Sequence, residues 1–93
     1  MSFRVETTAR FERQAIRFFR KHRELQPVFA RLLDDLMVNP FEPRLRLHRL
    51  SGQMEDIYAV SLTYKYRVTL TLLVSDDRIT LLDIGSHDEV YRG

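Results

Sequence analysis

The chain has 93 residues, of which 44% are hydrophobic and 30% charged, and its formal net charge is +2. This predicts a single soluble domain spanning residues 1–93, with no apolar run of the ~20 residues that cross a membrane and no signal-peptide core, and therefore a cytoplasmic protein. The absence of cysteine excludes cysteine nucleophiles, thiolate zinc sites and thiol redox chemistry.

A short strand and a pair of helices are predicted for the first forty residues. Residues 3–6 alternate apolar and polar side chains, which is typical of a strand. Thr7 or Thr8 can cap a helix over residues 9–22, and Pro27 suits the first turn of a second helix that ends near Val38. Because few residues separate the two helices, we expect an antiparallel hairpin.

One side of the first predicted helix is strongly basic. It carries five cations: Arg10, Arg13, Arg17, Arg20 and Lys21. The excess of basic residues extends over the whole first half of the chain. Residues 1–49 hold eleven Lys and Arg against six Asp and Glu, whereas residues 50–93 hold four Lys and Arg against seven Asp and Glu. The stripe is either a solvated face or a patch for a nucleic-acid backbone or an acidic partner, and the sequence leaves both interpretations open.

After a loop over residues 39–43, apolar and polar residues begin to alternate with a period of two. Residues 44–50 alternate strictly, which predicts a strand with three leucines on one face and Arg46 and His48 on the other, turned by Ser51 and Gly52. Residues 57–63, 66–74 and 78–84 are predicted to add an antiparallel meander. The expected fold class is α+β, with a short N-terminal strand and an antiparallel helix hairpin packed on one face of a mainly antiparallel sheet of four or five strands.

The polar face of this sheet and the segment after residue 84 bring together residues suited to cleaving RNA. They are Arg46, His48, Arg49, Arg67, His87 and Tyr91. Cleavage without a metal needs a base for the ribose 2′-hydroxyl and an acid for the leaving 5′-oxygen, and histidine titrates in the right range for either task. A guanidinium supplies a fixed cation for the phosphoryl oxygens, and an aromatic ring stacks on an unpaired base. Asp88 and Glu89 are interpreted as solvated turn residues.

Other kinds of site lack support in the sequence. Three scattered glycines form neither a P-loop nor a dinucleotide fingerprint. The three histidines have no metal-ligand spacing, and no nucleophile elbow supports a Ser–His–Asp triad. We therefore expect neither a cofactor nor a metal.

Five short motifs stand in a fixed order along the chain: Asn39-Pro40, Leu47 to Gly52, Tyr58, Tyr66-Arg67-Val68 and Leu81 to Tyr91. This ordered series resembles the RelE/ParE superfamily of bacterial type II toxins, closest to its YafQ-type mRNA interferase branch. YafQ-type chains share an H-x-L-x-G turn and a G-[ST]-H segment, which stand here at residues 48–52 and 85–87. The similarity follows the whole chain in order and length.

The resemblance implies roles for individual residues. His48 would act in catalysis or substrate placement, Arg67 would hold the scissile phosphate, and His87 would be the general acid or base. Arg46, Arg49, Lys65 and Tyr91 would bind the substrate. One histidine and one carboxylate of the YafQ branch are missing from residues 61–66. Lys65 or Arg67 would substitute, as in more basic RelE-like sites, and that assignment stays open. Which histidine is the base stays open.

The resemblance also implies a function. The chain would be the toxin of a type II toxin–antitoxin system, a metal-independent endoribonuclease that cuts mRNA in the ribosomal A site. Its partners would be a cognate antitoxin, mRNA and the ribosome, with operator DNA reached only through the antitoxin complex. One alternative is a ParE-like toxin that inhibits DNA gyrase by binding, against which the pairing of His48 with His87 argues. Another is an inactive or regulatory module that keeps the fold.

Overall fold

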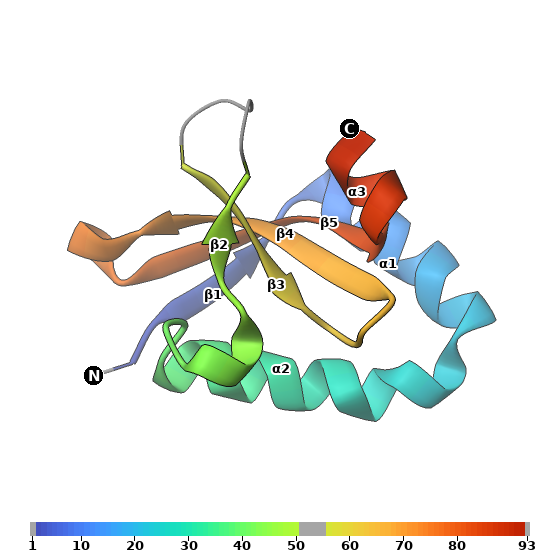
Figure 1. The fold of residues 1–93 in the computed structure, drawn as a ribbon, viewed down its shortest axis with the longest axis horizontal. Coiled ribbons are helices and arrows are strands. Elements are labelled where there is room, and N and C mark those ends of the chain that lie inside the picture. The colour runs from blue at the N-terminus through green and yellow to red at the C-terminus, as the bar shows by residue number, and fades with distance from the viewer. Residues whose placement is uncertain (1, 51–55, 93) are drawn as a thin grey trace.

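A sheet of strand order β1-β5-β4-β3-β2 runs through the molecule (Figure 1). The structure is a computed structural model that describes residues 2–50 and 56–92, with side chains described as far as Val90. The strands are β1 (Arg4–Thr7), β2 (His48–Arg49), β3 (Ile57–Ser61), β4 (Tyr66–Leu73) and β5 (Arg78–Ser86). β1 is parallel to β5 and every other pairing is antiparallel, so the mainly antiparallel α+β sheet predicted from the sequence is confirmed.

Two helices, α1 (Ala9–Lys21) and α2 (Gln26–Val38), are joined by the 3₁₀ turn η1 (Arg23–Leu25). The hydroxyl of Thr8 accepts a hydrogen bond from the Phe11 amide at 3.0 Å and so caps α1. The same hydroxyl donates to the Leu81 carbonyl of β5 at 3.1 Å, which fixes the start of the helix against the sheet. Both predicted helices are confirmed to within one residue at each end.

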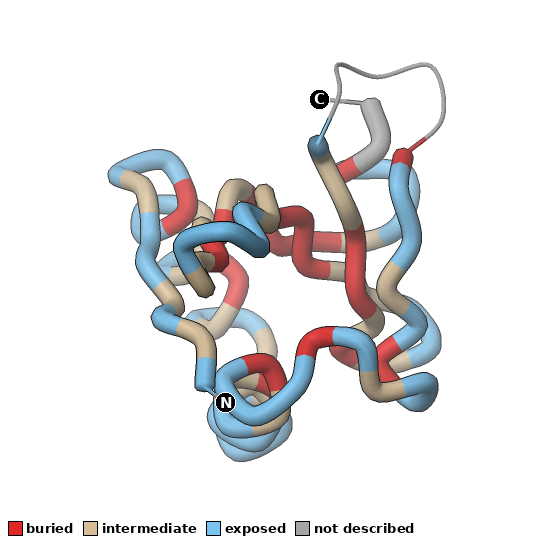
Figure 2. Tube along the Cα trace, turned by 90° about the vertical axis from the view of Figure 1, so that its left-hand side faces the viewer, coloured by how far each residue is buried: buried red, intermediate tan, exposed pale blue. Residues whose placement is uncertain are grey.

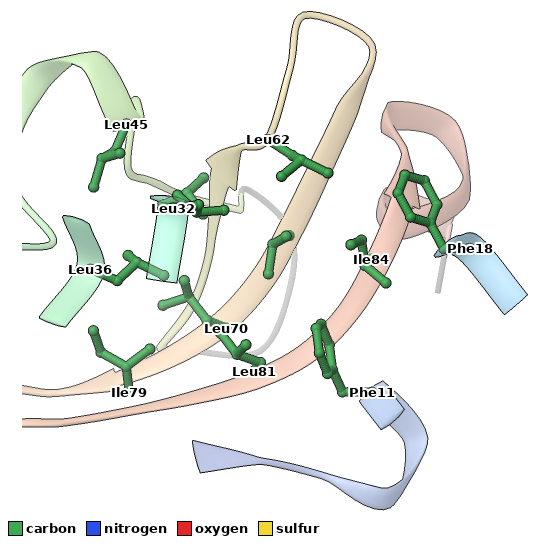
Figure 3. Packing of buried hydrophobic residues seen from close by; sticks show 12 residues of the cluster. Phe11, Phe18, Leu32, Leu36, Leu45, Leu62, Leu70, Ile79, Leu81 and Ile84 are labelled. Atoms are coloured by element: carbon green, nitrogen blue, oxygen red, sulfur yellow. The ribbon is translucent and has the colours of Figure 1, made fainter. Parts of the chain in front are cut away.

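The core lies between the sheet and the helix hairpin (Figure 3). Its buried members are Phe11, Phe18, Leu32, Leu36, Leu45, Val60, Leu62, Val68, Leu70, Ile79, Leu81 and Ile84. Figure 2 shows the buried positions gathered where strands and helices face one another. Each fully buried aliphatic side chain contributes about 1.5–3 kcal/mol, so this layer holds the hairpin on one face of the sheet. We refer to the opposite face, which the hairpin does not cover, as the open face, although Ala59 and Thr69 on it are buried.

The strand predicted over residues 44–50 is wrong for most of its length. Pro43–Leu45 form a 3₁₀ turn, η2, and Arg46 adopts a left-handed conformation with φ 56°. Proline favours this turn because its ring fixes φ near the helical value, and the Arg46 amide donates to the Pro43 carbonyl at 3.1 Å. Only His48 and Arg49 pair with β3. The turn expected at Ser51 and Gly52 lies outside the described residues.

The segment after Gly85 also differs from the expectation. β5 continues to Ser86, and a short helix, α3 (His87–Arg92), follows it where a solvated turn was expected. In Figure 1 this helix lies on the side of the sheet away from α2. No helix in the part of the chain that the structure describes is long and apolar enough to cross a membrane.

Candidate functional site

The open face of the sheet, opposite the helix hairpin, carries His48 and Arg67. Residues paired across neighbouring strands direct their side chains to the same face of a sheet. One row on the open face therefore consists of His48, Ala59 and Thr69, and the next consists of Ser61, Arg67 and Gly85. The rows are two residues, or about 7 Å, apart along the strands, and β2 lies about 10 Å from β4 across the sheet.

The side chain of Arg49 lies on the side of β2 opposite to that of His48. Its register partner is Tyr58, which packs against the core on the hairpin side. Nη2 of Arg49 donates to the Tyr58 hydroxyl at 3.3 Å, and the guanidinium carbon lies 5.6 Å from the ring centroid. The structure therefore separates Arg49 from the face that carries His48.

His48 is exposed on the edge strand β2. Its Nδ1 lies 2.8 Å from the carbonyl oxygen of Arg46. A carbonyl only accepts hydrogen bonds, so this contact requires the hydrogen of the neutral ring on Nδ1 and puts the lone pair on Nε2. The left-handed Arg46, which breaks the predicted strand, thereby determines the tautomer of the neighbouring histidine.

Arg67 clamps the turn between β3 and β4. Its Nη1 donates to the carbonyl oxygens of Thr63 at 2.7 Å, Tyr64 at 2.9 Å and Tyr66 at 3.2 Å. The side chain thus lies along its own strand toward the hairpin tip, where Lys65 is exposed. All three bonds use one nitrogen, so the edge of the guanidinium formed by Nε and Nη2 is not part of the clamp.

The start of α3 is held by a reciprocal pair of hydrogen bonds. The Ser86 amide donates to Glu89 Oε1 at 2.8 Å, and the Glu89 amide donates to Ser86 Oγ at 3.3 Å. This is a capping box, and it makes His87 the first residue of the helix. The interpretation of Glu89 as a solvated turn residue is therefore wrong, although the Ser-x-x-Glu spacing that signals the cap is visible in the sequence.

Gly85 lies against the side chain that caps α3. A Cβ at this position would lie 2.9 Å from Glu89 Oε1 and 3.4 Å from Glu89 Cβ. A methyl group here would therefore push the capping carboxylate aside, whereas glycine lets it cross the end of β5 this closely. Gly85, Ser86 and Glu89 together fix the direction in which the chain leaves the sheet.

These contacts bring His87, Lys65 and Arg67 to one end of the open face. The His87 amide donates to the Lys65 carbonyl at 3.3 Å, and Arg67 pairs in register with Gly85. The His87 ring is 58% exposed, and its Nδ1 lies 3.6 Å from Asp88 Oδ1. His48 lies on the same face at the opposite edge. Tyr91 lies in α3, but its side chain is outside the described residues.

A cleft of about 890 Å³ lies elsewhere, between α1, the second half of β5 and α3. Lys65 lines it, but His48, Arg67 and His87 do not. No group of three or more His, Asp or Glu side chains that could hold a metal ion occurs within residues 2–50 and 56–92.

Three solved structures resemble this chain over nearly its whole length. They are the Escherichia coli DinJ–YafQ toxin–antitoxin complex (13% identity, 98% of this chain and 99% of that chain, TM-score 0.78), a metal-bound toxin from Helicobacter pylori (20%, 97% and 99%, 0.79) and the archaeal RelE–RelB complex from Pyrococcus horikoshii OT3 (23%, 92% and 96%, 0.72). This chain has the fold of the RelE and YafQ toxins. No family model and no curated protein sequence matches the chain.

Two sequence motifs supported the resemblance, the G-[ST]-H segment at residues 85–87 and the H-x-L-x-G segment at residues 48–52. They lie in different kinds of structure. Residues 85–87 form the junction of β5 and α3, whereas the H-x-L-x-G segment begins at β2 and continues outside the described residues. The junction is therefore the motif whose physical role the structure explains: a close approach at Gly85, a cap at Ser86 and an exposed ring at His87.

The capping box predicts a pH-dependent start of α3. The pKa of Glu89 is lowered from 4.5, chiefly because its carboxylate accepts the hydrogen bond from the Ser86 amide. Since the pKa is lower in the folded state, the cap contributes its full stability above pH 4.5 and loses it as the pH falls through the lowered pKa.

We expect the Ser86 amide resonance to titrate with a midpoint below 4.5 when followed by NMR. In Glu89→Gln, which cannot ionise, this titration should vanish. A Ser86 midpoint at or above 4.5, or an identical titration in the variant, would contradict the cap.

Proposed function

We propose that this chain is the toxin of a type II toxin–antitoxin system and acts as a metal-independent endoribonuclease that cleaves mRNA on the ribosome. The observation that carries the proposal is the meeting of Arg67 and His87 at one end of the open sheet face, in a chain with the fold of the RelE and YafQ toxins. The pairing of a fixed cation with an exposed imidazole suits phosphodiester cleavage.

The reaction follows from the chemistry of these groups. One histidine removes the proton of a ribose 2′-hydroxyl, whose oxygen forms a bond to the adjacent phosphorus. The bond from phosphorus to the 5′-oxygen breaks, and the second histidine protonates that oxygen. Arg67 stabilises the charge that develops on the phosphoryl oxygens through the Nε and Nη2 edge that the hairpin clamp does not use.

His48 suits the role of base, because its contact with the Arg46 carbonyl leaves the lone pair of the neutral ring on Nε2. His87 suits the role of acid at the other side of the substrate. β2 and β5 lie three strand spacings, about 14 Å, apart, which leaves room for an RNA strand between the two rings.

The remaining candidates surround this path. Lys65 is exposed beside Arg67 at the hairpin tip, and Arg46 is exposed beside His48. We propose that these two cations bind substrate phosphates and that Tyr91 stacks on a base. We propose that Arg49, whose guanidinium is held over Tyr58 on the other side of β2, binds the substrate only where the RNA passes the edge of β2.

The proposed partners are a cognate antitoxin, mRNA and the ribosome, with operator DNA bound only through the antitoxin complex. YafQ and RelE have each been crystallised in a complex with a second protein, DinJ and RelB. The similarity in fold supports an antitoxin for this chain, and the reaction requires the cytoplasm, where mRNA is translated.

Primer extension on a transcript after a short pulse of expression tests the activity. We expect new 5′ ends in the reading frame that disappear when translation is blocked. His87→Ala should reduce cleavage by about 10²-fold or more, because the leaving oxygen loses its acid. Ser75→Ala, an exposed change in the 3₁₀ turn before β5, is the control and should cleave like the wild type.

Intact transcripts in cells whose growth has stopped would contradict the nuclease. DNA damage signalling in the same cells would then favour a gyrase inhibitor of the ParE type. Cleavage that His87→Ala leaves unchanged would contradict the assigned role of His87.

Arg67→Lys separates the clamp from the phosphate contact. An ammonium group donates up to three hydrogen bonds and can reach the same turn carbonyls, so we expect the melting temperature to fall only slightly. Cleavage should fall by about 10²-fold, because lysine lacks the planar fork. Arg31→Lys, an exposed change on α2, is the matched control for both measurements. A wild-type cleavage rate in Arg67→Lys would show that the fork is not needed.

A further inference from the structure

The cleft between α1 and the end of β5 is strongly basic, and Lys65 is the one cation of its described lining that the proposed function assigns to the substrate. Five cations line it: Arg10, Arg17, Arg20, Lys21 and Lys65. Among the described residues that line it, the carboxylates are Asp83 and Glu89. We refer to this cleft as the basic cleft. In Figure 1, α1 and α3 lie close together at this end of the molecule.

Both carboxylates of the basic cleft are engaged with the backbone. β1 pairs only with residues 78–81 of β5, so the edge of β5 beyond Leu81 has no neighbouring strand. Asp83 Oδ1 accepts from the Ile84 amide at 2.9 Å, and Glu89 Oε1 accepts from the Ser86 amide at 2.8 Å. The two acids therefore cover the exposed edge of the strand, which would otherwise be open to pairing.

Most of the cations lack an acidic partner. Arg10 forms an ion pair with Asp83 at 3.1 Å, whereas Arg17 donates only to the neutral Gln14 amide at 3.2 Å. Arg17, Arg20, Lys21 and Lys65 form no ion pair with any acid that the structure describes. The cleft therefore has an excess of positive charge that an anionic ligand would neutralise.

The cations follow one line along α1. Arg10, Gln14, Arg17 and Lys21 succeed one another at spacings of three or four residues, which places them on one side of the helix. The row is about 16 Å long, and Lys65 adds a cation from the hairpin tip. Such a row matches the repeating charge of an extended phosphodiester backbone, for which short single-strand sites span about four nucleotides or more.

The lining suits a nucleic acid better than an acidic protein. Protein interfaces depend on exposed apolar side chains at their centre. In the basic cleft Phe18 and Ile84 are only 8% and 5% exposed, and Phe18 packs edge-on against Tyr66. The exposed apolar side chain of α1, Ile16, lies outside the cleft.

We propose that the basic cleft is a second RNA-binding surface, which holds the phosphodiester backbone of a single strand without regard to sequence. The basic cleft lies at the edge of β5, apart from the open face that carries His48 and Arg67. Binding of RNA in the basic cleft does not require that the RNA be cleaved. The proposal rests on the proposed function only in taking the strand to be RNA. RNA that passes beyond α3 from the open face reaches this surface at Lys65.

Fluorescence anisotropy with a labelled 2′-O-methyl oligouridine of about 12 nucleotides tests the proposal, because this RNA has no free 2′-hydroxyl and cannot be cut. We compare the wild type with Arg17→Gln/Lys21→Gln over a series of salt concentrations. The variant should bind about tenfold more weakly at low salt, and the slope of log K against log salt should decrease in magnitude by about 1.4, for two lost phosphate contacts on a single strand.

The matched control is Arg13→Gln/Arg31→Gln, which removes the same charge from exposed positions outside the cleft. It should keep the wild-type slope. Circular dichroism should show the same fold in all three proteins, since every substituted side chain is exposed. Polyglutamate at equal charge should displace the RNA only weakly.

An unchanged slope in the cleft variant, or an equal loss in the control, would overturn the proposal. Complete displacement by polyglutamate at equal charge would also overturn it, in favour of an acidic protein ligand. The assay scores binding alone, so its failure is distinct from a failure to cleave mRNA in the primer-extension experiment.

Discussion

The register of β4 against β5 determines the positions of Arg67 and Gly85 in the proposed site, while the pairing of β2 with β3 places His48. It pairs Val68 with Ile84 on the core side and Arg67 with Gly85 on the open face. A slip of one residue would exchange the two faces, burying the guanidinium and exposing the core. The apolar residues that hold the helix hairpin therefore also hold Arg67 on the open face.

Gly85 links the register of β4 and β5 to the position of His87. Because it pairs with Arg67 and has no side chain, the capping carboxylate of Glu89 passes directly over the end of β5. The cap then starts α3 at His87, and the His87 amide binds the carbonyl of Lys65 in the adjacent hairpin. The strand register, the glycine and the helix cap thus together fix the backbone position of His87, whose imidazole is exposed.

Much of this architecture follows from the sequence, because long periodic segments have only one way to bury their apolar side. The helices and β3 to β5 belong to this group. The predicted strand at residues 44–50 failed because burial of Leu45 is satisfied equally well by the turn that Pro43 begins. The helix α3 was missed because six residues are too few to show a helical period.

The residue types of the candidate site were proposed from the sequence, and their roles stay a prediction. Its contacts could not be predicted, because the clamp of Arg67 on the Thr63 to Tyr66 turn depends on a hairpin geometry that no pattern of alternation specifies. The basic side of α1 was visible as a stripe. That it lines a cleft follows only from where β1 ends and α3 begins.

The central claim is that the geometry at Gly85 positions His87 for RNA cleavage. The most direct measurement is the cleavage rate of Gly85→Ala, determined by primer extension together with its melting temperature. The account predicts a loss of about tenfold or more while the melting temperature shows a folded protein, because the added methyl group displaces the Glu89 carboxylate and so breaks the cap that starts α3 at His87. A folded Gly85→Ala protein that cleaves at the wild-type rate would contradict the account.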